Sequence, residues 1–125
     1  MREFEKIVDA TLRVSSITCT SVMAMIVAIV RFPLDPEMSA DAVRASFEAS
    51  APSYRGLPGL LRKHYLLGDG VGGGVYLWES REAAEAIYDV AWRERLTERF
   101  GAAPTVEYFE SPVTVDPDSI TVGPQ

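Results

Sequence analysis

The sequence predicts an α+β fold of the ferredoxin-like type, in which elements in the order βαββαβ form an antiparallel sheet with both helices on one face. Three observations predict it. Runs rich in β-branched and aromatic residues alternate with two stretches in which apolar residues recur at helical spacing. Each of these stretches begins next to a serine that can cap a helix. The length of 125 residues suits one domain and is too short for two.

The first half of the domain supplies a strand and a helix. Residues 25–32 (MIVAIVRF) are apolar and rich in β-branched side chains, which favours a buried strand. Ser39 is the predicted cap of a helix over residues 40–51 or a little beyond. The apolar stripe of this helix consists of Val43, Phe47 and Tyr54.

The second half supplies three strands and a longer helix. Residues 60–67 and 74–80 are aromatic and aliphatic and predict two strands. Ser80 is the predicted cap of one helix over residues 81–100, and residues 105–115 predict the last strand. The face of the second helix that repeats at helical spacing consists of Ala84, Ile87, Tyr88, Ala91 and Trp92.

The folded domain is expected to span residues 23–116. We interpret residues 1–22 as an N-terminal extension, either a start-site artefact or a loosely held arm. The apolar run 14–30 is short for a membrane span, contains several Ser and Thr, and is not preceded by the basic region of a secretion signal. Residues 117–125 are interpreted as a polar tail available to a neighbouring chain.

Composition excludes several classes of function. The net charge of −6 and the lack of a basic cluster argue against nucleic acid as a partner. With one cysteine, Cys19, and one histidine, His64, the chain lacks the ligands of a structural zinc site and cannot form an internal disulfide framework. We therefore expect a cytoplasmic protein without a metal and without membrane or nucleic-acid partners.

Both faces of the predicted sheet are apolar. In the first strand, one face carries Ile26, Ala28 and Val30 and the other carries Met25, Val27 and Ile29. A sheet covered by helices on one side only should alternate apolar and polar residues. A second cover is therefore expected, and we predict a homodimer that closes sheet to sheet.

Glycines dominate residues 68–74. Gly68, Gly70 and Gly73 match the spacing G-x-G-x-x-G of dinucleotide-binding loops. That motif acts only where the glycines lead directly into a helix, and here a β-prone segment follows them. We predict a hairpin loop in which glycines adopt positive φ angles.

The segment 57–88 resembles the YdhR-like monooxygenases of the dimeric α/β-barrel superfamily, related to antibiotic-biosynthesis monooxygenases. The matching positions are Pro58-Gly59, the run from Gly73 to Trp78, Ala84 and Tyr88. Together with the strand order, the resemblance covers about residues 25–116. It implies a dimeric α/β barrel with an apolar cavity between sheet and helices in each subunit.

The resemblance also implies chemistry. Related branches oxidise polycyclic phenols to quinones with O₂ and without a metal or organic cofactor, and others degrade haem. Those branches commonly use an asparagine with an aromatic or histidine partner, but this chain has no asparagine. Ile87 takes the place of the haem-degrading branch's tryptophan, and the second helix has no histidine, so haem degradation is not expected.

His64 is the predicted general base, because it is the only side chain that ordinarily titrates near neutrality. It shares a strand face with Arg62, while Lys63 and Tyr65 occupy the other face. For a phenolic substrate, His64 would take the hydroxyl proton and Arg62 or Arg31 would hold the phenolate. Alternatively, His64 is a structural residue at a sheet edge or a dimer seam.

An aromatic-rich interior predicts a ligand cavity. The expected substrate-binding residues, beside Arg31, are Tyr54, Tyr76, Trp78, Tyr88 and Trp92. Ordinary core packing is the alternative for each of them.

The leading functional hypothesis is a monooxygenase acting without a cofactor on a small aromatic, phenolic or quinone-like molecule. A second hypothesis is a non-catalytic module that binds a small molecule or serves a stress response. A third is a structural interaction protein whose cavity is filled by its own side chains.

Overall fold

The computed structural model describes residues 25–123, so the predicted extension 1–22 lies outside the described residues. The elements are β1 (Met25–Pro33), α2 (Ala40–Tyr54), β2 (Leu60–Gly68), β3 (Val71–Trp78), α3 (Arg81–Ile87), α4 (Val90–Phe100), β4 (Thr105–Ser111), β5 (Val113–Asp116) and β6 (Ser119–Val122). Within residues 25–123, no helix is both long enough and apolar enough to cross a membrane.

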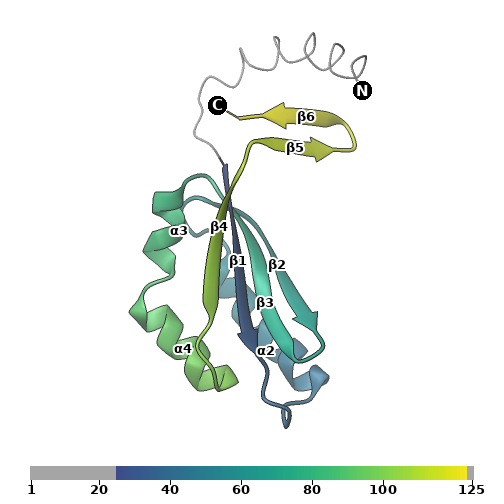
Figure 1. The fold of residues 1–125 in the computed structure, drawn as a ribbon, viewed down its shortest axis with the longest axis vertical. Helices are drawn as coiled ribbons and strands as arrows, with labels where there is room; N and C mark the ends of the chain where they lie inside the picture. The colour runs from purple at the N-terminus through teal and green to yellow at the C-terminus, as the bar shows by residue number, and fades with distance from the viewer. Residues whose placement is uncertain (1–24, 124–125) are drawn as a thin grey trace.

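The main sheet has the strand order β2-β3-β1-β4, and each neighbouring pair is antiparallel. This confirms the predicted ferredoxin-like arrangement. Figure 1 shows α2 behind the sheet, α3 and α4 along its β4 side, and no helix over the face turned to the viewer. The predicted pairing into a dimeric barrel is not tested by a single chain and stays a prediction.

The core lies between the sheet and the helices. Along β1, side chains alternate between buried and partly exposed, and Ile26, Ala28, Val30 and Phe32 point into the core. The other buried members of the core are Val43, Tyr76, Trp78, Ala84, Tyr88, Trp92 and Phe100. Burial of these aromatic and aliphatic side chains is the main stabilising contribution.

The second helix is not continuous, which corrects the prediction of one helix over residues 81–100. α3 ends at Ile87, with Tyr88 as its C-cap, and Asp89 is the N-cap of α4, where its carboxylate accepts a hydrogen bond from the Trp92 amide at 2.9 Å. Aspartate is a strong N-cap residue, so it starts a new helix here. The break keeps Tyr88 and Trp92 buried but leaves Ala91 exposed.

The predicted last strand, residues 105–115, is two strands. Pro112 separates β4 from β5, and β5 leaves the main sheet to pair with β6. Proline has no amide proton for a strand ladder, which explains the break. Residues 117–125, which were predicted to be a polar tail, contain β6. Figure 1 shows this hairpin extending beyond the end of the main sheet.

The predicted hairpin is present, since β2 and β3 pair antiparallel, but most of its glycines lie in the strands and not in the loop as predicted. Only Asp69 and Gly70 separate β2 from β3, and of the five glycines from 68 to 74 only Gly70 has a positive φ, of 75°. Gly73 pairs with Arg31 of β1, where a Cβ would lie 1.9 Å from the Val30 carbonyl oxygen. Glycine is required at this position because the two backbones approach closely.

Candidate functional site

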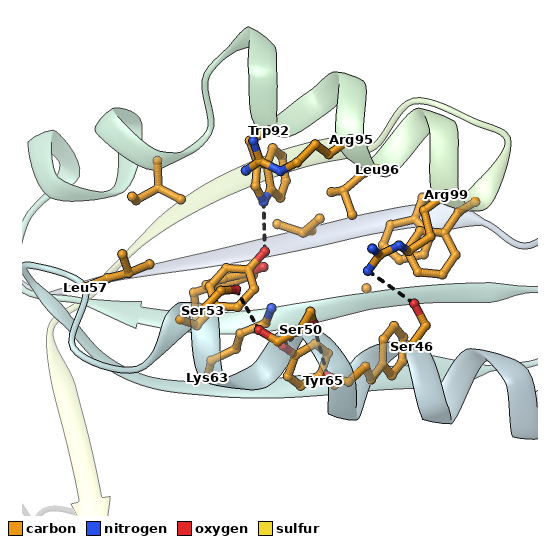
Figure 2. Close-up of a pocket in the computed structure, with 18 of the residues that line it drawn as sticks. Ser46, Ser50, Ser53, Leu57, Lys63, Tyr65, Trp92, Arg95, Leu96 and Arg99 are labelled. Carbon is orange, nitrogen blue, oxygen red and sulfur yellow. Dashed lines mark hydrogen bonds between the residues drawn. The ribbon is translucent and has the colours of Figure 1, made fainter.

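A cavity of about 440 Å³ lies between α2, α4 and the helix-facing side of the sheet (Figure 2). This volume is in the range of sites that bind small molecules. Its aromatic wall consists of Phe32, Phe47, Tyr54, Tyr65, Tyr76, Trp92 and Phe100. Its charged lining residues are Lys63, Asp89, Arg95 and Arg99.

Lys63 extends from β2 into the cavity, and three tyrosines surround its ammonium group. The Nζ atom lies 3.4 Å from the centre of the Tyr54 ring, 3.8 Å from that of Tyr65 and 4.5 Å from that of Tyr76. We call these three residues the tyrosine cage. Among residues 25–123, no carboxylate lies within ion-pair distance of Lys63. The amine is therefore held by aromatic faces rather than by a counter-ion.

Burial lowers the pKa of Lys63 from 10.5 to about 7. The aromatic faces favour the ammonium form and partly oppose this effect. Both the neutral amine and the ammonium ion are consequently accessible near neutral pH. Burial also raises the pKa of Tyr65 and of Tyr76, so these two cage phenols stay neutral where Lys63 titrates.

Hydrogen bonds fix two of the cage rings. The Trp92 indole Nε1 donates to the Tyr54 hydroxyl at 3.0 Å, which links α4 to the end of α2 above the cavity (Figure 2). The Tyr65 hydroxyl lies 2.8 Å from the Ser50 hydroxyl of α2. These bonds hold the rings around Lys63 in one orientation, as a binding site for a flat ligand requires.

The predicted aromatic site residues divide into two groups. Tyr54, Tyr76 and Trp92 line the cavity, and their role in binding a substrate stays a prediction. Trp78 and Tyr88 are buried in the core without lining the cavity, and the Trp78 Nε1 donates to the Tyr88 hydroxyl at 2.9 Å. The burial of Trp78 and Tyr88 agrees with the alternative interpretation, in which these side chains pack in the core.

The predicted catalytic residues lie on the opposite face of the sheet. His64 pairs in register with Val75, and Arg62 with Leu77, on the face that the helices do not cover. Both side chains are exposed. Arg31 is exposed on the same face and forms an ion pair with Glu107 of β4. The structure thus separates these three residues from the cavity, and their predicted roles find no support in its geometry.

Lys63 is the functional residue that sequence reasoning missed. Strand alternation already placed Lys63 and Tyr65 opposite His64, but a histidine is the residue type that ordinarily titrates near neutrality, which favoured His64 as the base. One further signal was available. Lys6 and Lys63 are the only lysines among the twelve Lys and Arg residues, and Lys63 lies inside a strand run whose outer residues are aliphatic and aromatic. Because the pKa of a lysine shifts readily on burial and that of an arginine does not, Lys63 was a second candidate base beside His64.

The part of the chain that the structure describes contains no group of three or more His, Cys, Asp or Glu side chains placed to hold a metal ion. The cavity's own potential donors are a lysine, serine and tyrosine hydroxyls and one carboxylate. Such a set does not resemble the usual ligand sets of zinc or redox metals.

No protein-family profile and no curated protein matches the sequence. Solved structures do share its fold. A protein of unknown function from Nitrosomonas europaea superposes with a TM-score of 0.62 at 17% identity, over 78% of this chain and 98% of that one. A heme-degrading protein from Mycobacterium tuberculosis superposes with a TM-score of 0.55 at 21% identity, over 76% and 99%.

SnoaB, a cofactor-independent oxygenase from Streptomyces nogalater, also superposes with a TM-score of 0.55, at 15% identity over 74% of this chain and 97% of that one. At these identities the likeness shows the fold alone. Membership of the YdhR-like monooxygenases and of their superfamily stays a prediction.

Proposed function

We propose that this protein is a monooxygenase that oxidises a small phenolic or quinone-like aromatic molecule in the cavity, without a metal or organic cofactor. The observation that carries the proposal is Lys63 within its tyrosine cage. An aromatic cavity with a titratable amine at its wall combines a surface for a flat ring with a group that can accept a phenolic proton. The fold that the chain shares with a cofactor-independent oxygenase supports this assignment.

Lys63 would act as the general base in place of His64. In its neutral form the amine takes the proton of the substrate hydroxyl, and the resulting ammonium ion pairs with the phenolate. A phenolate gives up an electron to O₂ more readily than a phenol does. For oxidation of a phenol to a quinone, one O₂ supplies one oxygen atom to the ring and one to water, so no external reductant is needed.

Oxygen uptake tests the proposal. With naphthols as substrates, we expect one O₂ consumed per quinone formed, and a loss of about 100-fold or more in kcat/KM for Lys63→Met. His64→Gln separates the two candidate bases, because it should leave turnover nearly unchanged. Arg44→Gln on the outside of α2 is the control. Absence of oxygen uptake with every such substrate would contradict the proposal.

The alternative is a non-catalytic protein that binds a small aromatic molecule. The chain has no asparagine to orient oxygen, which favours this alternative. A thermal-shift screen distinguishes the two: an aromatic compound that raises the melting temperature and is recovered unchanged under air would identify a binding protein.

We further propose that the protein is a homodimer that closes through the uncovered face of the sheet. Val27, Ile29, Val75 and Leu77 form the centre of this face and are only partly covered, and Phe109 at its side is 49% exposed. A continuous apolar patch of this kind on a sheet is typical of an interface. The exposed His64 would then lie near the dimer seam.

A single charge on this face should disrupt the dimer. Val27→Asp is expected to yield a folded monomer, because it would bury a carboxylate without a partner in the interface. Val90→Asp, which makes the same change at a 69% exposed position at the start of α4, is the matched control and should leave the dimer intact. Light scattering coupled to size-exclusion chromatography measures both. A wild-type monomer at micromolar concentration would contradict the proposal.

A further inference from the structure

The charge of the cavity is opposite to that of the protein. The chain carries a net charge of −6, but the residues lining the cavity include three bases, Lys63, Arg95 and Arg99, and one acid, Asp89. The Asp89 carboxylate accepts the Trp92 amide at the start of α4. The protein as a whole is acidic, but basic residues outnumber acidic ones around this aromatic cavity, which favours a negatively charged ligand.

The two arginines stand together at the cavity. Arg95 and Arg99 are four residues apart on α4, so they project from the same side of the helix, next to Leu96 (Figure 2). Arg99 reaches α2, where its Nη1 lies 3.4 Å from the Ser46 hydroxyl. Neither guanidinium forms an ion pair with a carboxylate within residues 25–123. Their planar donor groups are therefore available to a ligand.

The positive groups lie at different places on the wall. Lys63 comes from β2 and its amine lies within the tyrosine cage, whereas the arginines come from α4 (Figure 2). Aromatic and aliphatic side chains, among them Phe47, Phe100 and Leu96, complete the lining. A ligand that satisfies both ends would combine a flat apolar body with a polar group toward Lys63 and an anionic group toward the arginines.

We propose that the cavity is a recognition site for an aromatic carboxylate, whose carboxylate is bound by Arg95 and Arg99. A guanidinium presents paired N–H donors that match the two oxygens of a carboxylate. The inference rests on the proposed function in one respect only: it places a phenolic hydroxyl of the same molecule at Lys63. The substrate class is then a hydroxylated aromatic acid.

Binding of matched compounds to the intact protein tests this inference without requiring turnover. The probes are 6-hydroxy-2-naphthoate, which carries its hydroxyl and carboxylate at opposite ends of the ring system, its methyl ester and 6-hydroxy-2-naphthyl phosphate, with affinities measured by calorimetry. We expect the carboxylate to bind about tenfold more tightly than the ester, since charge-assisted hydrogen bonds are lost in the ester. Arg95→Gln and Arg99→Gln should each weaken carboxylate binding about threefold and leave ester binding unchanged.

Arg93→Gln is the matched control, because it removes the same charge from α4 at a residue that does not line the cavity. Equal affinity for carboxylate and ester would overturn the inference, as would an equal effect of all three arginine substitutions. Tighter binding of the phosphate would overturn the assignment to a carboxylate. Oxidation of a neutral naphthol without preference for the acid would leave the proposed function standing, whereas tight binding of the acid without oxygen uptake would leave only this inference.

Discussion

Lys63→Met is expected to stabilise the protein by about 2 to 4 kcal/mol at pH 7. In the unfolded chain the amine has its ordinary pKa of 10.5, but burial lowers it to about 7 in the folded protein. At neutral pH the folding protein must therefore either desolvate the charged amine or deprotonate it, which costs about 4 kcal/mol. The attraction between the ammonium group and the three tyrosine rings offsets part of this cost. Methionine has similar length and carries no charge, so this cost disappears.

The effect has a defined pH dependence. Below pH 7 both folded and unfolded chains carry the proton on Lys63, and the cost is fully present. Between pH 7 and 10.5 the unfolded chain binds more protons than the folded one, so the stability of the wild type rises with pH. We expect a rise of about 2 kcal/mol from pH 7 to pH 9 that Lys63→Met lacks.

Urea denaturation at pH 6, 7, 8 and 9 measures the free energy of unfolding of both proteins, and their difference isolates Lys63 from other titrating groups. Lys63→Arg is the informative control, because arginine keeps its charge throughout this range: relative to the wild type, it should destabilise the protein by an amount that grows as the pH rises above 7. Parallel pH profiles for the wild type and Lys63→Met would contradict the prediction.

Gly73→Ala is expected to destabilise the protein by about 3 kcal/mol, at the upper end of the range for overpacking. The added Cβ would lie 1.9 Å from the carbonyl oxygen of Val30 and 3.2 Å from the Cα of Arg31. These are backbone atoms of the neighbouring central strand, so relief requires β1 and β3 to move apart and weakens their ladder.

Thermal and chemical denaturation measure the effect of Gly73→Ala. Gly70→Asn is the matched control in the same hairpin: a Cβ there meets no atom within 4 Å, and asparagine tolerates the positive φ of 75°. It should cost less than about 1 kcal/mol. A Gly73→Ala protein as stable as Gly70→Asn would show that the two strands can separate without loss of stability.

The two predictions bear differently on function. Gly73 serves the sheet that carries the cavity, whereas Lys63 is expected to lower the stability of the fold and has no counter-ion within the described residues. A residue that costs stability and lies in a cavity is typical of functional sites. If Lys63→Met is more stable than the wild type and no longer consumes oxygen, the amine contributes to catalysis and not to stability.

The sequence by itself determined the order of the elements, because the periodicity of apolar residues and the serine caps are local signals. Ser39 and Ser80 cap helices as predicted. Alternation along residues 60–67 also placed Lys63 and His64 on opposite faces. By contrast, the break at Asp89 was missed, since an apolar stripe that continues past Tyr88 hides a cap in the middle of the run.

Only the tertiary structure decided which face of β2 meets the cavity and what surrounds each side chain there. The tyrosine cage joins Tyr54 of α2, Tyr65 of β2 and Tyr76 of β3, which are three different elements, so no helical or strand periodicity brings these rings together. The pKa of Lys63 follows from this burial, whereas the residue type alone would assign the proton chemistry to His64. Local sequence sets the order of the elements, but desolvation and the gathering of charge depend on contacts between elements that the fold alone brings together.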